Sequence, residues 1–149
     1  MNTKHYKIDD IDAIIKNFAT FMHDGKPHFL VVDDSGVNRK MMVRVLKELN
    51  YLDITEGKDG VECIALLNDL MNKDVIILLD LNMPRMDGLQ CLKQIKSKED
   101  TKHIPVIIVS TNTSREKIVS SVELGAEAYV VKPFTAAQIS EKIEQILDK

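Results

Sequence analysis

The chain has 149 residues, of which 44% are hydrophobic and 29% are charged, and its formal net charge is −3 at pH 7. This length and balance predict one soluble globular domain with its own core. A slightly acidic chain offers no basic field for nucleic acid or an anionic membrane surface. Its apolar runs are far too short to span a membrane, and the polar residues 1–10 lack the apolar core of a signal peptide. We therefore expect a cytoplasmic protein.

The chain contains two cysteines, Cys63 and Cys91. Both lie in stretches with helical periodicity, and they form no Cys-x-x-Cys pair. In a reducing cytoplasm such residues are more often small buried hydrophobes than a disulfide or a metal pair. We expect two reduced, buried thiols.

The first part of the chain, residues 1–27, is distinct from the rest. Its apolar residues recur every three or four positions, which predicts an amphipathic helix over 8–23 that ends before Gly25 and Pro27. These apolar residues are Ile8, Ile11, Ile14, Ile15, Phe18, Phe21 and Met22. We expect a helical extension and linker at 1–27 and one domain at 28–149. Three roles are open for this extension: it could dock on the domain, join two copies into a dimer or bind a partner protein. We therefore expect either a monomer or a dimer.

The rest of the chain alternates between short apolar runs and amphipathic stretches. The apolar runs predict strands at 29–32, 52–55, 75–79, 104–109 and 128–131. The amphipathic stretches predict helices at 37–49, 59–71, 88–97, 113–124 and 135–147. Thr113 and Glu116 should cap the fourth of these helices, which Gly125 should end, and Thr135 and Gln138 should cap the last. This alternation predicts an α/β fold, a doubly wound parallel sheet with helices on both faces. The two most apolar strands, 75–79 and 104–109, should lie inside the sheet.

Polar residues stand where four of the predicted strands end. They are the pair Asp33-Asp34, then Asp80, Ser110 and Lys132. Parallel strands place their carboxyl ends at one edge of the sheet, so we expect these side chains to converge. Taken singly, each has an ordinary explanation as a helix cap, a turn residue or a solvated charge. Together, in this order along successive strands, they favour a common site.

The expected cluster of carboxylates suits a metal and phosphoryl transfer. Carboxylates held close together repel one another and retain protons, and a hard divalent cation such as Mg²⁺ removes that conflict. A carboxylate such as Asp80 can accept a phosphoryl group as an acyl phosphate. Mg²⁺ and Lys132 would supply positive charge to the phosphoryl oxygens, and Ser110 would supply a hydroxyl.

Several motifs together resemble the receiver domain of two-component response regulators, of the CheY-like single-domain type. They are Val31-Val32-Asp33-Asp34-Ser35, Leu79-Asp80-Leu81-Asn82-Met83-Pro84-Arg85-Met86-Asp87-Gly88, Pro105-Val106-Ile107-Ile108-Val109-Ser110, Gly125-Ala126 and Lys132-Pro133-Phe134. The resemblance covers about 28–149. It implies a flavodoxin-like, five-stranded parallel sheet with strand order 2-1-3-4-5, an order taken from the family.

The resemblance implies a role for each site residue. Asp80 would accept a phosphoryl group from a sensor histidine kinase. Mg²⁺ would be held by Asp34, Asp80 and the backbone carbonyl of Asn82, with Asp33 acting mainly through water. The phosphoryl-binding and switch residues would be Ser110, Thr111, Tyr129 and Lys132, and the peptide bond before Pro133 would be cis.

Two of these positions depart from the family pattern. Ser110 stands where a threonine is usual and keeps the hydroxyl, whereas Thr111 stands where alanine is usual and can crowd Asp80. Asn82 and Asn112 occupy positions that tune the lifetime of the acyl phosphate.

The chain ends soon after the last predicted helix, so we expect its output to be protein binding by the receiver itself. The expected partner is a flagellar motor switch protein in chemotaxis. The alternative is a phosphorelay intermediate that passes its phosphate to a histidine phosphotransfer protein. A phosphatase is a further candidate partner. Such a protein catalyses its own phosphorylation and slow dephosphorylation but is not otherwise an enzyme.

Two other classes fit the sequence less well. A flavodoxin-like cofactor binder needs a phosphate-cradling loop, but residues 33–36 are Asp-Asp-Ser-Gly, whose charge repels phosphate. A phosphohydrolase with an aspartyl nucleophile needs an added cap, for which the loops are too short.

Overall fold

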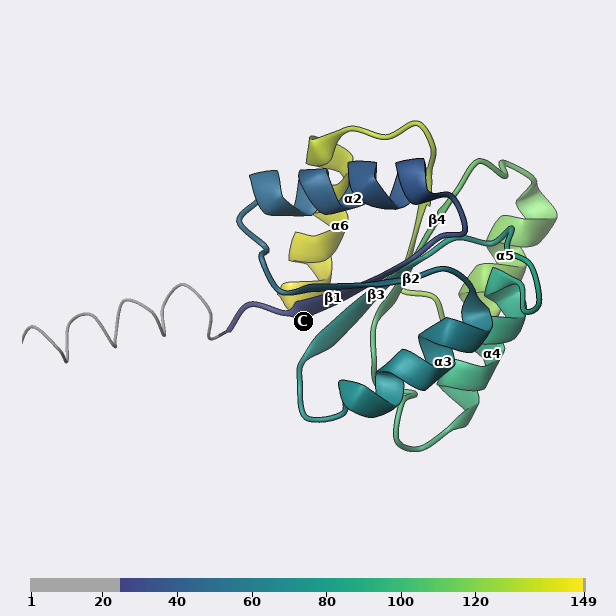
Figure 1. The fold of residues 1–149 in the computed structure, drawn as a ribbon. Helices are drawn as coiled ribbons and strands as arrows, with labels where there is room; N and C mark the ends of the chain where they lie inside the picture. The colour runs from purple at the N-terminus through teal and green to yellow at the C-terminus, as the bar shows by residue number, and fades with distance from the viewer. Residues whose placement is uncertain (1–24, 149) are drawn as a thin grey trace, which may run out of the picture.

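The computed structural model describes residues 25–148 as one α/β unit (Figure 1). Its strands are β1 (His28–Val32), β2 (Ile54–Gly57), β3 (Val75–Leu79), β4 (Val106–Ser110) and β5 (Ala128–Val131). Its helices are α2 (Gly36–Glu48), α3 (Gly60–Asp69), α4 (Gly88–Ser97), α5 (Arg115–Glu123) and α6 (Ala136–Leu147). The helix predicted over 8–23 lies outside the described residues.

The five strands form one parallel sheet with the order β2-β1-β3-β4-β5. Helices α2 and α6 cover one face, and α3, α4 and α5 cover the other (Figure 1). The predicted doubly wound fold is therefore confirmed. So is the inner position of the two most apolar strands, because β3 is central and β4 has a neighbour on each side.

Alternating side chains of each inner strand feed two separate cores. In β1, Leu30 and Val32 pack with α3 and α4, whereas Phe29 and Val31 pack with α2 and α6. All five residues of β3 are buried, as are all five of β4. Burial on both faces explains their unbroken apolar runs, since no position of these strands faces water.

The sequence misplaced the ends of two strands. The second was predicted at 52–55, but Leu52 is 56% exposed and β2 begins at Ile54, opposite Phe29 of β1. The fourth was predicted from 104, but β4 begins at Val106 because the amide of Ile104 bonds back to Thr101 in a turn.

The start of α5 was also predicted wrongly. The N-cap is Ser114, whose hydroxyl accepts from the amide of Lys117 at 3.3 Å, rather than Thr113. The reason is local: the side chain of Asn112 accepts from the amide of Ser114 at 2.9 Å. This Asx turn delays the helix by one residue.

Other local predictions are confirmed. Cys63 and Cys91 are free and fully buried. Thr135 and Gln138 form the capping box that begins α6. Gly125, with φ of 102°, follows α5 in the left-handed conformation that ends many helices. Among residues 25–148, no helix has the length and apolar character needed to cross a membrane.

Candidate functional site

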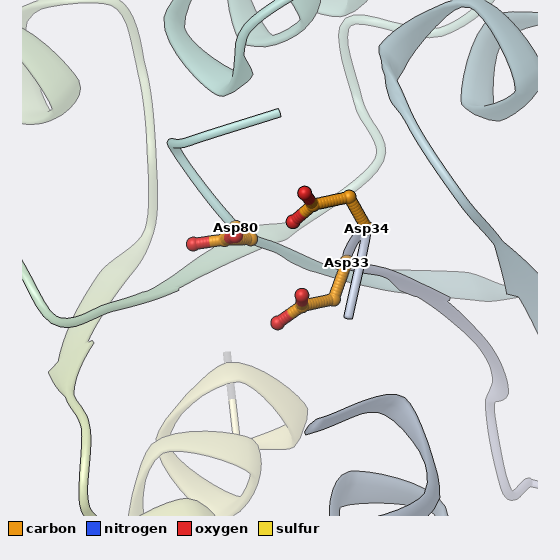
Figure 2. A group of neighbouring side chains, drawn as sticks. All are labelled: Asp33, Asp34 and Asp80. Atoms are coloured by element: carbon orange, nitrogen blue, oxygen red, sulfur yellow. The ribbon is translucent and has the colours of Figure 1, made fainter. Parts of the chain in front are cut away.

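Three carboxylates meet at the carboxyl edge of the sheet. Asp33 and Asp34 follow β1, and Asp80 follows β3, the neighbouring strand. One carboxylate oxygen of each lies within 4.8 Å of the others. Figure 2 shows all three side chains pointing to the same side of these strand ends. The convergence expected from parallel strands is thus present in the structure.

Asp33 is held on several sides. Its side chain is buried; Oδ1 accepts from the amide of Ser35 at 2.9 Å, and Oδ2 lies 2.5 Å from Nζ of Lys132. Its backbone carbonyl accepts from Nη1 of Arg39 at 2.6 Å. Asp34, by contrast, is exposed to solvent. The site therefore has one fixed carboxylate and one that can adjust to a ligand.

Asp80 lies deeper than its position in a loop would suggest. Its residue is 7% exposed, and its amide donates to the carbonyl of Val32 at 2.9 Å. Burial raises the pKa of Asp80 to about 6; the Lys132 ammonium, 3.7 Å away, opposes this shift, and the neighbouring Asp33 carboxylate adds to it. The charged carboxylate is thus poorly compensated in the protein alone.

Lys132 enters the cluster from β5. The side chain is 13% exposed, and its ammonium contacts both Asp33 and Asp80. The peptide bond from Lys132 to Pro133 is cis, as the resemblance implies. A single cation therefore lies between the two buried carboxylates, where it could reach a group attached to either.

Ser110 and Tyr129 both bond the backbone of Asn112. The Ser110 side chain is fully buried, and its Oγ accepts from the amide of Asn112 at 3.1 Å. The Tyr129 hydroxyl donates to the carbonyl of Asn112 at 2.7 Å. The half-buried Tyr129 packs against the core cluster beneath α3 and α4. A change at Ser110 can therefore reach Tyr129 through one residue of loop.

Thr111 and Asn82 are both exposed. Thr111 lines a cavity of about 210 Å³ that also touches Asp33, Asp80 and Lys132. The contribution expected of Asn82 is its backbone carbonyl. The structure thus gathers Asp33, Asp80, Lys132 and Thr111 around one space.

A close approach of backbone fixes the loop that carries Asn82. The amide of Gly88 donates to the carbonyl of Leu81 at 2.8 Å, and a Cβ on Gly88 would lie 2.2 Å from the carbonyl oxygen of Asp80. No side chain fits there, which is the physical need for glycine at that position.

Sequence reasoning missed two arginines that support the site. Arg39 bonds the Asp33 carbonyl and pairs with Glu56 at 3.3 Å, and Arg85 donates two bonds to one oxygen of buried Asp59, at 2.9 and 2.6 Å. The second contact ties the loop after β3 to the start of α3. Neither pairing has a sequence signal, since each joins residues brought together by the fold.

The donor set fits a hard divalent cation. Three carboxylates and nearby backbone carbonyls are oxygen ligands of the kind that Mg²⁺ takes in proteins. An ion there would stabilise the charged form of Asp80 and so lower its pKa, which burial raises. The same groups can form an acyl phosphate, because Asp80 is a carboxylate nucleophile with a cation beside it.

The raised pKa of Asp80 predicts a pH-dependent loss of stability when no metal is present. The folded pKa of about 6 exceeds the ordinary value of 3.8, so the folded state binds the proton more tightly. The resulting stabilisation is complete at pH values below the ordinary pKa, and it is lost as the pH rises through the pKa of the folded state. Relative to Asp80→Asn, the wild type should lose about 2 kcal/mol between about pH 4 and pH 7.

This expectation is checked by urea unfolding of both proteins over that pH range in a chelating buffer. Comparing the two proteins cancels the contributions of the other titrating groups. A difference in unfolding free energy that stays constant with pH would contradict the prediction. Adding Mg²⁺ near neutral pH should stabilise the wild type more than the variant.

Comparisons with known proteins agree with this geometry. The model of the response regulator receiver domain matches residues 29–144. The chemotaxis protein CheY of Pseudomonas aeruginosa is 35% identical over 120 residues, which cover 80% of this chain and 95% of that protein. The chemotaxis protein CheY-3 of Vibrio cholerae is 33% identical over 120 residues, covering 80% and 91%.

A solved structure shares the fold closely. It is the CheX–CheY–BeF3–Mg+2 complex from Borrelia burgdorferi, with a TM-score of 0.76 and 26% identity over 82% of this chain and 90% of that one. The family match covers most of the chain, and the two curated relatives exceed 30% identity. The chain belongs to the response regulator receiver domain family and has the CheY-like fold.

Proposed function

We propose that this protein is a signalling receiver phosphorylated on Asp80 in the presence of Mg²⁺. The observation that carries the proposal is the arrangement of three carboxylates within 4.8 Å, with the Lys132 ammonium against two of them. Bound Mg²⁺ would neutralise the carboxylates and the phosphoryl oxygens; Asp33, Asp34, Asp80 and the Asn82 carbonyl would hold it. The receiver would correspond to 28–149, preceded by the extension at 1–27.

The proposed reaction is a phosphoryl transfer from a phosphohistidine of a sensor kinase. A carboxylate oxygen of Asp80 forms a bond to phosphorus as the phosphorus–nitrogen bond breaks, and the leaving imidazole takes up a proton. Lys132 shifts its ammonium toward the new phosphoryl oxygens, while Ser110 donates its hydroxyl to one of them. The exposed Thr111 borders the same cavity and limits access to the acyl phosphate.

The proposed output is a change of surface that another protein binds. Because Ser110 and Tyr129 both bond Asn112, a Ser110 hydroxyl drawn toward a phosphoryl group alters the loop before α5 and the packing of Tyr129. Chemotaxis is supported by the similarity to CheY proteins, with a flagellar motor switch protein as the proposed target. A protein of the CheX kind, bound to CheY in the Borrelia structure, or a phosphatase is a further proposed partner. With such partners, the proposed location of the protein is the cytoplasm.

The proposal is tested by incubating the protein with radiolabelled acetyl phosphate. One phosphoryl group per chain should be incorporated with Mg²⁺ and almost none with a chelator. A pull-down should then compare protein loaded with BeF3⁻ and Mg²⁺ with unloaded protein. Capture of one partner by the loaded form supports phosphorylation-dependent binding, whereas transfer of label onward to a histidine would identify a phosphorelay intermediate. No incorporation under any condition would refute the proposal.

A further inference from the structure

An exposed face of α2 borders the cavity beside Asp80. Val37 is 70% exposed and Met41 55% exposed, one turn apart on the same side of the helix. Met41 also lines the cavity of about 210 Å³, together with Pro133 and Phe134 of the loop after β5. This apolar surface, made by Val37, Met41, Pro133 and Phe134, is called the α2 surface below.

Basic side chains flank the α2 surface. Lys40 and Arg44 follow Val37 and Met41 by three residues each, and Lys47 continues their row along the helix. These three residues line a shallow hollow on the outside of α2. The helix has four basic residues and one acidic residue, so a partner segment for this face should be apolar with acidic flanks.

The N-terminal segment of this same chain has that composition. Its residues 8–22 hold the predicted apolar stripe, and their charged residues are Asp9, Asp10, Asp12 and Lys16. The stripe is apolar enough to need a covering surface, since an amphipathic helix of this length is marginal alone in water.

The first described residues lie beside the C-terminal end of α2, from which the preceding segment could fold back along the helix. Lys26 donates to the carbonyl of Asn50 at 3.1 Å, and its ammonium lies 5.9 Å from the centre of the Tyr51 ring. Both residues follow the C-terminal end of α2. Figure 1 shows the first described residues leaving the sheet at that same end. Gly25 has φ of 83° and is exposed, so the chain can reverse direction there.

The lengths also match. A helix over residues 8–22 would span roughly 21 Å, and α2 with its 13 residues spans about 20 Å. A segment that folds back at Gly25 would therefore lie along the whole of α2. Asp9, Asp10 and Asp12 would come level with the half of α2 that carries Lys40, and Ile14 and Ile15 would come level with Met41.

We propose that residues 8–22 dock on the α2 surface of their own chain. The groove between the ends of α3 and α4 is a poorer site, because Lys98 and Asp100 give it no net charge and no described contact ties the chain start to it.

Thiol labelling in the full-length protein tests the docking. Cys63 and Cys91 are fully buried, so a maleimide would react with a thiol introduced by Val37→Cys. In the protein with the native segment, we expect this thiol to react at least about fivefold more slowly than in a variant that also carries Ile11→Lys and Ile15→Lys. The reason is that the thiol is reachable only while the segment is undocked. Lys40→Glu with Arg44→Glu should restore fast labelling in the same way. Circular dichroism checks that each variant is folded.

Met71→Cys provides the matched control, since Met71 is 45% exposed at the far end of α3. Its labelling rate should not respond to the changes at Ile11 and Ile15. Equal labelling of the Val37→Cys thiol in both backgrounds would overturn the proposal, as would protection of the Met71→Cys thiol instead. Protection that grows with protein concentration would also overturn it, because the segment would then cover a second copy. The experiment contains no phosphoryl donor, so its outcome is independent of whether Asp80 is the acceptor.

Discussion

Asp80→Asn is expected to abolish phosphorylation by acetyl phosphate in the presence of Mg²⁺. Asparagine has nearly the same size and fits the same buried position, but its amide is a very poor nucleophile and carries no charge for a metal. The initial rate of label incorporation should fall by about 10³-fold or more. Rapid filtration of radiolabelled protein measures this rate, and mass spectrometry after borohydride reduction locates the modified residue.

Asp100→Asn is the matched control for this experiment. It removes one carboxylate from an exposed position away from the cluster and should leave the rate unchanged. If Asp80→Asn were labelled at the wild-type rate, the acceptor would lie elsewhere. Unfolding of the variant is not expected to confuse the result, because loss of a buried, poorly compensated carboxylate should stabilise the metal-free protein.

The sequence predicted the central strand β3 better than the edge strand β2, for a physical reason. β3 is buried on both faces, so its five apolar residues stand out and Asp80 marks their end. β2 lies at the edge of the sheet, and its burial is partial. Its sequence therefore carries a weaker pattern, and the register with β1 decides where it begins. The strand order itself came from the family resemblance and not from periodicity.

The site was predictable to the extent that topology determines it. Parallel strands bring their carboxyl ends together, so the sequence alone places Asp33, Asp80 and Lys132 at one edge of the sheet. The bonds from Arg39 to the Asp33 carbonyl and from Arg85 to Asp59 were not predictable. They depend on where a long side chain from one element meets another, and surface arginines occur in most helices and loops without such a partner.

Lys132→Ala should separate metal binding from the response to a phosphoryl group. The ammonium lies against Asp33 and Asp80, where it competes with a cation for the same carboxylates. Its removal should therefore leave Mg²⁺ affinity within about tenfold of the wild type, in the direction of tighter binding. Titration of Mg²⁺ followed by amide chemical shifts at the site measures this affinity.

The same variant should lose the structural response to BeF3⁻ and Mg²⁺. In the wild type, a negatively charged group on Asp80 draws Lys132 away from Asp33, and Lys132 is three residues from Tyr129 on the same chain segment. Without the ammonium, β5 has no charged link to the phosphoryl group, so the bond from Tyr129 to Asn112 should stay as it is. The amide chemical shifts of Tyr129 and Asn112, recorded with and without BeF3⁻, measure this response and should not change in the variant.

Lys98→Ala, at an exposed position, serves as the control and should behave as the wild type. If Lys132→Ala showed the full BeF3⁻ response, the signal would have to travel through Ser110 alone, whose hydroxyl reaches Asn112 without any cation. Loss of the response with retained Mg²⁺ binding would instead show that the cation in the metal-free cluster also transmits the signal. Lys132 would then have two successive roles: compensating buried carboxylates before phosphorylation and linking β5 to the phosphoryl group after it.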